Sequence, residues 1–98
     1  MVQINWTHQA KNDLKKISEY ISKDSKRYAR LQIAKLRART IILKSQTESG
    51  KVVEELNDTS IRELVEGNYR IIYKVVSLER VDILTVHHAA RDLFKRKI

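Results

Sequence analysis

The sequence predicts an α+β domain in which an antiparallel helical hairpin packs on one face of an antiparallel sheet. Three observations support this fold class. A short alternating run opens the chain, two amphipathic segments with helical periodicity follow, and three β-rich runs fill the second half. The expected order is β-α-α-β-β-β. With 98 residues there is room for one hydrophobic core, so residues 1–98 are expected to form a single domain.

The first strand is expected at residues 2–6, and Thr7 can cap the following helix by accepting hydrogen bonds from free backbone N–H groups. The break at residues 23–25 is so short that the next helix must turn back on the first. Asp24 or Ser25 can cap this second helix, which is expected to run to about Lys44. The buried stripes are Ala10, Leu14, Ile17 and Ile21 in the first helix and Ala29, Ile33, Leu36 and Leu43 in the second.

The second half of the chain is expected to hold three strands, near residues 60–66, 69–76 and 80–88. Residues 45–51 are polar and end the second helix, and residues 52–59 are consistent with either extended or irregular structure. Gly67 and Asn68 both tolerate positive φ, so they predict a two-residue hairpin turn. This turn pairs Val65 with Arg70 and Arg62 with Tyr73.

The last two strands are expected to join through a turn centred on Leu78 and Glu79. This turn pairs Val76 with Val81, and it therefore also pairs Arg70 with His87 and Tyr69 with His88. Because side chains alternate between faces, a slip of one residue would exchange the two histidines. The predicted core face holds Leu64, Ile71, Tyr73, Val75, Leu84 and Val86, and the open face holds Glu63, Val65, Arg70, Ile72, Lys74, Thr85 and His87.

A cationic cluster is predicted on the open face, where Arg70 lies opposite His87 with Lys74 nearby and Arg91 shortly after. Arginine offers planar, bidentate donors to phosphate or carboxylate groups, and histidine transfers protons near neutral pH. Strand ends exposed to water would carry the same residue types without any such role. The residues expected to bind an anionic target are Arg62, Arg70, Lys74, His87 and Arg91.

Charge is unevenly distributed along the chain. The formal net charge is +8, and residues 1–49 carry 11 Lys or Arg against 4 Asp or Glu. This excess predicts attraction to nucleic acid or to an acidic protein partner, although a solvated helix face would carry the same charges. Most of it lies in Lys23, Lys26, Arg27, Arg30, Lys35, Arg37, Arg39 and Lys44.

Composition excludes several classes of protein. The sequence has no cysteine, and thus neither a disulfide framework nor a thiolate metal site. No apolar stretch approaches the roughly 20 residues that span a bilayer, and no signal peptide is expected at the start. Only two glycines are present, so a phosphate-binding glycine loop is not predicted. We therefore expect a cytoplasmic protein without metal or other cofactor.

The chain also resembles the RelE/ParE superfamily of bacterial toxins from type II toxin–antitoxin modules, over nearly its whole length. The resemblance rests on the order and spacing of several short motifs. These are Trp6, Thr7, Ala10, Asp13, Leu14, Ile17, Tyr20 and Ile21; Ala29; Gly50 and Lys51; Arg62, Glu63 and Leu64; Tyr69, Arg70, Ile71, Ile72 and Tyr73; and Val86, His87, His88 and Arg91.

The resemblance implies a helical hairpin on a curved antiparallel sheet. It implies one of two activities, unless the chain is a degenerate member retained only for antitoxin or operator binding. ParE-like toxins inhibit DNA gyrase, whereas RelE-like toxins cleave mRNA on the ribosome. The first helix and the strand around Arg70 are closer to ParE-like members. Phe94 stands where many RelE-like chains carry a catalytic tyrosine, and it has no hydroxyl for proton transfer. If the protein is instead a metal-independent endoribonuclease, its candidate catalytic residues are Arg62, Arg70, His87, His88 and Arg91.

The resemblance further implies a cognate antitoxin that neutralises the toxin in a hetero-oligomer and links it to operator DNA. It implies roles in growth inhibition and plasmid stabilisation, with DNA gyrase as the expected target and the ribosome and mRNA as the alternative. No membrane partner is expected. Charge and amphipathicity together suggest that the antitoxin contacts the helical hairpin through Leu14, Ile17, Arg30, Ile33 and Arg37.

Overall fold

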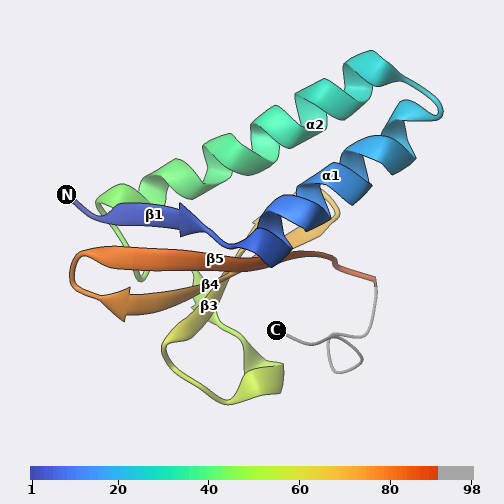
Figure 1. Ribbon diagram of the computed structural model, residues 1–98. Helices are drawn as coiled ribbons and strands as arrows, with labels where there is room; N and C mark the ends of the chain where they lie inside the picture. The colour runs from blue at the N-terminus through green and yellow to red at the C-terminus, as the bar shows by residue number, and fades with distance from the viewer. Residues whose placement is uncertain (91–98) are drawn as a thin grey trace.

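The computed structural model describes residues 1–90 and has the predicted α+β architecture, with two helices lying across one face of a sheet (Figure 1). The strands lie in the order β1-β5-β4-β3-β2. The elements are β1 (Gln3–Trp6), α1 (His8–Ser22), α2 (Lys26–Arg39), the 3₁₀ helix η1 (Thr40–Lys44), β2 (Lys51–Val52), the 3₁₀ turn η2 (Glu54–Leu56), β3 (Ile61–Glu66), β4 (Tyr69–Ser77) and β5 (Arg80–His88).

The sheet differs from the prediction in two respects. It is mixed, because β1 runs parallel to β5 while the other neighbouring strands are antiparallel. It also has a fifth strand, because β2 pairs with β3 at the edge of the sheet. The segment 52–59, expected to be extended or irregular, contains the end of β2 and the η2 turn. Asn57 then follows η2 in the left-handed region at φ 48°, a conformation that asparagine tolerates better than most residues.

Hydroxyl caps define the helical hairpin. The Thr7 side chain accepts from the Ala10 N–H, and the Ser25 side chain accepts from the Tyr28 N–H, as predicted for both helix starts. The α-helical part of the second helix ends at Arg39 and continues as η1 to Lys44, the predicted limit. Here the Thr40 hydroxyl donates to the Arg37 carbonyl at 2.7 Å and stabilises the tighter turn.

The β3–β4 hairpin follows the predicted register. Gly67 has φ 59°, the positive value that the turn requires. Val65 pairs with Arg70, and Arg62 pairs with Tyr73.

The predicted β4–β5 register is confirmed at the Tyr69–His88 end of the ladder and is wrong in the middle of the ladder. Arg70 pairs with His87 as predicted, but Val81 pairs with Val75 instead of Val76. The register shifts between Ile72 and Tyr73 and again between Val75 and Ser77. The two shifts have opposite sense, so they cancel before the hairpin ends.

The two register shifts are explained by the pattern of polar and apolar residues along β5. An uninterrupted ladder would turn Asp82 and Leu84 toward the helices together with Val86. The shift at Leu84 instead places Val81 and Ile83 in the core, both fully buried. Leu84, predicted for the core face, lies on the other side of the sheet with Ile72 and Val53.

The main core lies between the hairpin and the sheet, as the periodicities predicted. Its buried members are Ala10, Leu14, Leu36, Leu43, Leu64, Ile71, Tyr73, Val81, Ile83 and Val86. A smaller apolar cluster on the open face contains Val53 and Ile72, with Leu56, Ile61 and Leu84 packed against it.

Asp13 of α1 closes a gap at the edge of β5. The pairing of β1 with β5 stops at Trp6 and Ile83, so the residues beyond have no strand beside them on that side. The Asp13 carboxylate accepts the Val86 N–H at 3.0 Å and the Thr85 hydroxyl as well. Thr85, predicted for the open face, therefore directs its hydroxyl to the first helix. A side chain of α1 thus takes the place of a strand partner.

Candidate functional site

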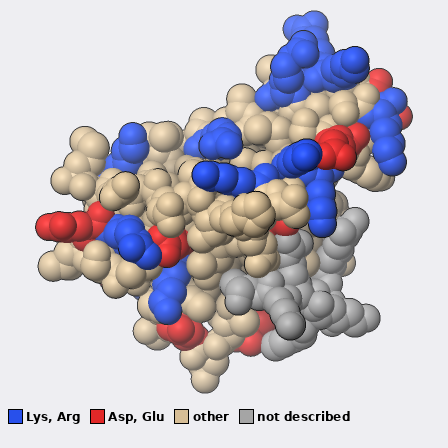
Figure 2. Space-filling view, in the orientation of Figure 1, with Lys and Arg blue, Asp and Glu red and all other residues tan. Residues whose placement is uncertain are grey.

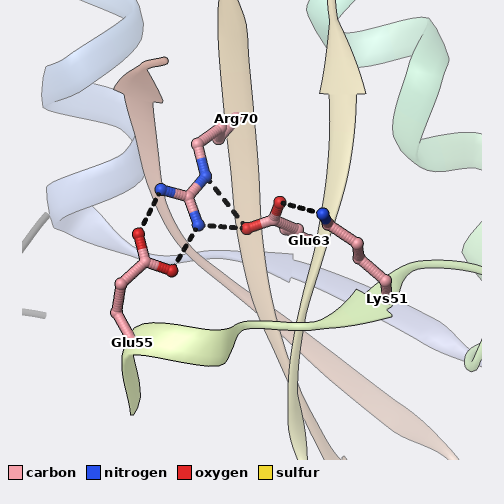
Figure 3. Close-up of polar contacts among 4 residues, drawn as sticks. All are labelled: Lys51, Glu55, Glu63 and Arg70. Atoms are coloured by element: carbon pink, nitrogen blue, oxygen red, sulfur yellow. Dashed lines mark hydrogen bonds and ion pairs between the residues drawn. The ribbon is translucent and has the colours of Figure 1, made fainter. Parts of the chain in front are cut away.

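Four charged side chains form a linear network on the open face of the sheet (Figure 3). Arg70 of β4 binds Glu55 of η2 in bidentate fashion, with Nη1–Oε2 at 2.7 Å and Nη2–Oε1 at 2.9 Å. Its Nε donates to Glu63 Oε2 of β3 at 2.9 Å, and Nη2 contacts the same oxygen. The other carboxylate oxygen of Glu63 lies 3.9 Å from Lys51 Nζ of β2.

The centre of this network is shielded from water, whereas Lys51 at its end is exposed. The side chains of Arg70 and Glu63 are 13% and 5% exposed. The hydrogen bonds from Arg70 lower the pKa of Glu55 to about 2, and the same contact is the main cause of a raised pKa for Arg70. Two cations and two carboxylates offset one another. The donors of Arg70 are therefore directed at carboxylates of its own chain.

The two adjacent histidines lie on opposite faces of β5. His87, 3% exposed, lies opposite Arg70 on the β4–β5 ladder. His88 packs edge-on against Tyr69 with ring centroids 5.5 Å apart, and its Nδ1 accepts the Ala90 N–H at 3.2 Å. The two imidazoles therefore belong to different surroundings, and one site cannot use both.

The remaining predicted target-binding residues do not gather around Arg70. Arg62 donates to the Gly50 carbonyl at 2.9 Å and to the Glu48 carbonyl at 3.4 Å, so it fastens the loop before β2. Lys74 is exposed farther along β4. Arg91, and with it the comparison based on Phe94, lies outside the described residues. Of the predicted set, the described structure brings together Arg70 and His87.

The same loop is held by Gly50 and Tyr73. The Tyr73 hydroxyl accepts the Gly50 N–H at 3.0 Å and donates to the Thr47 carbonyl at 2.7 Å. A Cβ at position 50 would lie 2.4 Å from the Glu63 carbonyl oxygen, so only glycine fits without a backbone shift.

Sequence reasoning missed Glu55 and Lys51 as partners in the charged network. Neither β2 nor η2 could be placed from the sequence, because the segment 52–59 has no clear periodicity. One signal in the sequence was available. The acidic residues Glu54 and Glu55 directly follow the β-compatible pair Val52 and Val53, in a chain with a net charge of +8.

A second candidate site is an open groove of about 470 Å³ along the hairpin, between α1 and α2. Leu14, Ile33 and Ala34 supply its apolar surface, and its charged residues are all cationic. The groove includes four of the five residues predicted to bind the antitoxin, and Ile17 instead borders a different cavity. Its lining is Lys11, Leu14, Lys15, Ser18, Arg30, Ile33, Ala34 and Arg37.

One cation of this groove is held in a fixed position. The guanidinium of Arg37 lies 5.1 Å from the centre of the Trp6 ring, a cation–π contact between α2 and β1. This contact orients Arg37 at the edge of the groove without using its hydrogen-bond donors on another charged group.

Within residues 1–90 no group of three or more His, Asp or Glu side chains is placed to hold a metal ion. No helix among these residues is both long and apolar enough to cross a membrane.

A hairpin of two helices on a five-stranded mixed sheet, with one strand before the helices and four after them, is the fold of the RelE/ParE superfamily of toxins. Residues 4–93 match the family model described as "ParE toxin of type II toxin-antitoxin system, parDE". The chain belongs to this family, and it is the toxin of a type II toxin–antitoxin system.

A solved structure titled "Chromosomal ParDE TA system from P. aeruginosa" has a similar fold. The TM-score is 0.72, the sequences are 18% identical, and the match covers 90% of this chain and 96% of the other. At that identity the likeness concerns the fold alone. A comparison with curated protein sequences finds no match.

Proposed function

We propose that this ParE-family toxin acts in the cytoplasm by inhibiting DNA gyrase through a binding surface and does not cleave RNA. The single observation that supports gyrase inhibition over RNA cleavage is the pairing of Arg70 with two carboxylates. Its guanidinium is bound by Glu55 on one side and Glu63 on the other. Family membership supports the same choice, because gyrase inhibition is the known role of ParE toxins.

The two ion pairs of Arg70 argue against RNA cleavage on chemical grounds. Attack by a ribose 2′-OH needs a general base beside that hydroxyl and a cation beside the phosphate. Here the cation opposite His87 is Arg70, which already donates hydrogen bonds to the carboxylates of Glu63 and Glu55. A phosphate would have to displace one of these carboxylates. A bound carboxylate would also repel the phosphate. Gyrase inhibition requires only a stable surface of suitable shape.

The antitoxin is proposed to lie in the hairpin groove. An acidic segment with apolar residues at helical spacing would place its apolar face on Leu14, Ile33 and Ala34 and its carboxylates beside Arg30 and Arg37. Such a segment is expected to be disordered until it binds. The resulting hetero-oligomer would reach operator DNA through the antitoxin.

Two assays on the purified toxin test this proposal. DNA supercoiling by gyrase should be inhibited as toxin is added, and transcripts on translating ribosomes should remain uncut. Inhibition that disappears when the cognate antitoxin is added in equal amount would establish specificity. Transcript cleavage with unaffected supercoiling would overturn the proposal in favour of RNA cleavage.

A further inference from the structure

A cavity of about 450 Å³ lies beneath the far end of the hairpin, between the two helices and the beginning of the β4–β5 ladder. It is separate from the charged network on the open face and from the groove between the helices. Its size lies in the range of sites that bind small molecules or single nucleotides. The residues that carry the argument are Lys16, Tyr20, Tyr28, Gln32, Tyr69 and His88.

Aromatic rings form much of the wall. Tyr20 and Tyr28 are 69% and 55% exposed at the end of the hairpin, although their rings adjoin a cavity. Tyr69 and His88, which also line the cavity, pack against each other with their rings nearly perpendicular. Exposed rings beside a concavity offer flat surfaces on which another ring can stack.

A buried amide adds directional hydrogen bonding. Nε2 of Gln32 is buried and has no hydrogen-bond partner within the described residues. A buried donor without an acceptor destabilises the fold. The last torsion of a glutamine is soft, so a small rotation can direct the amide toward an acceptor in the cavity. Asn68 is a second amide residue in the same lining.

Positive charge gathers around the mouth of the cavity. Lys16 lines it, and Lys23, Lys26 and Arg27 lie where the two helices meet; Figure 2 shows several basic side chains at this end of the hairpin, with fewer acidic ones among them. Lys23 Nζ lies 5.9 Å from the centre of the Tyr20 ring. No salt bridge within the described chain involves any of these four cations.

Together these features point to a ligand with a flat ring, hydrogen-bonding edges and a negative charge close by. We propose that this cavity binds one base of a single-stranded nucleic acid, whose adjoining phosphates lie on the basic end of the hairpin. Bases stack on tyrosine rings, side-chain amides pair with base edges, and lysine and arginine hold the phosphates. The proposal is independent of gyrase inhibition and of antitoxin binding in the groove.

The test uses the full-length toxin and fluorescently labelled single strands of about eight nucleotides, a length that spans the mouth and the cavity. DNA and RNA strands of the same sequence separate the two sources of a base, and blunt duplex DNA is the control ligand. Adenosine monophosphate and ribose 5-phosphate, added as unlabelled competitors, separate binding of the base from binding of the phosphate. The single strands should bind, and the duplex should bind much more weakly, because its bases are stacked inside.

Two variants and a matched control locate the site. Tyr28→Ala should weaken binding about 5- to 150-fold, since stacking of one base contributes about 1–3 kcal/mol. Gln32→Ala should weaken it about 2- to 10-fold. Leu31→Ala, at a residue 50% exposed between them that does not line the cavity, should bind as the wild type does.

Three outcomes would overturn the proposal. The first is failure of the single strands to bind. The second is equal binding of duplex and single strand, or equal competition by ribose 5-phosphate and adenosine monophosphate, either of which would show charge attraction without a base site. The third is wild-type affinity in both Tyr28→Ala and Gln32→Ala. Thermal unfolding of each variant, compared with Leu31→Ala, separates a lost contact from a lost fold.

Discussion

Arg70 and Glu55 form a bidentate ion pair that joins the central strand β4 to the η2 turn, with N–O distances of 2.7 and 2.9 Å (Figure 3). The pair lies on the open face of the sheet, where the sequence predicted a cationic cluster. A face that looked suited to holding an external anion instead holds its own carboxylates. The proposal of gyrase inhibition in place of RNA cleavage rests largely on this contact.

Replacing both histidines should separate the two activities. In His87→Ala with His88→Ala we expect supercoiling inhibition and growth arrest to persist, because a binding surface depends on several contacts and not on proton transfer. A ribonuclease would lose about 10²–10⁴-fold in cleavage rate. Both activities are measured on the same purified variant.

His87 is buried, so the double variant also needs a stability control. A cost of about 0.5–3 kcal/mol in unfolding free energy is expected from the loss of packing. His88→Ala alone is the milder comparison, because that side chain is half-buried. Loss of growth arrest in a folded double variant, together with loss of transcript cuts, would contradict gyrase inhibition.

Glu55 should make the stability of the protein depend on acid. Its pKa is lowered from 4.5 to about 2 in the folded state, so the pair with Arg70 stabilises the fold above pH 4.5 and this contribution is lost as the pH falls toward 2. Glu55→Gln should cost about 1–3 kcal/mol at neutral pH. The same substitution should also flatten the pH dependence of urea unfolding between these limits.

Glu54→Gln is the matched control for this experiment. Glu54 precedes Glu55 in η2, is exposed, and makes no salt bridge with another described residue. It should unfold like the wild type throughout the pH range. Equal pH profiles for Glu55→Gln and the wild type would show that the ion pair contributes nothing to folding.

Asp13 should be needed for stability and not for antitoxin binding. Asp13→Ala removes the acceptor of the Val86 N–H and of the Thr85 hydroxyl, which should lower the free energy of unfolding by about 1–3 kcal/mol. Asp13→Asn keeps one amide oxygen as acceptor and should be milder. Asn12→Ala, at the exposed neighbour, serves as control in urea unfolding. An unchanged free energy of unfolding in Asp13→Ala would disprove the stabilising role of Asp13 at the edge of β5.

The hairpin groove should bind the antitoxin partly through charge. Reversing Arg30 and Arg37 to Glu should weaken the complex and reduce its dependence on salt, measured by titration calorimetry at two ionic strengths. Lys35→Glu removes the same kind of charge from α2 outside the groove and should have a much smaller effect. Unchanged affinity in the double reversal would place the antitoxin elsewhere.

Much of the fold follows from local patterns in the sequence. Thr7 and Ser25 mark both helix starts, and Gly67 fixes the β3–β4 turn. The pairing of Arg70 with His87 was predictable because the two register shifts cancel. The shifts themselves were not, since they arise from tertiary packing that keeps Asp82 out of the core and brings Ile83 into it.

The site was less predictable than the fold. Side-chain alternation placed Arg70 and His87 on one face, but the identity of Arg70's partners depends on where η2 folds. That turn is held by contacts with β3, such as the Val53 N–H donating to the Ile61 carbonyl at 3.1 Å. Parallel pairing of β1 with β5 also escaped prediction, because no short connection links them.

That parallel pairing has a consequence for how the toxin is made. Gln3 is aligned with Arg80, so among the described residues the strand that pairs with β1 is synthesised after every other element of the sheet. The helices and the β3–β4 hairpin can form from local contacts during synthesis, whereas β1 must wait for β5. A nascent chain stopped before residue 80 leaves β1 without its strand and α1 without the backbone that Asp13 holds. Completion of the sheet therefore waits until β5 has been synthesised.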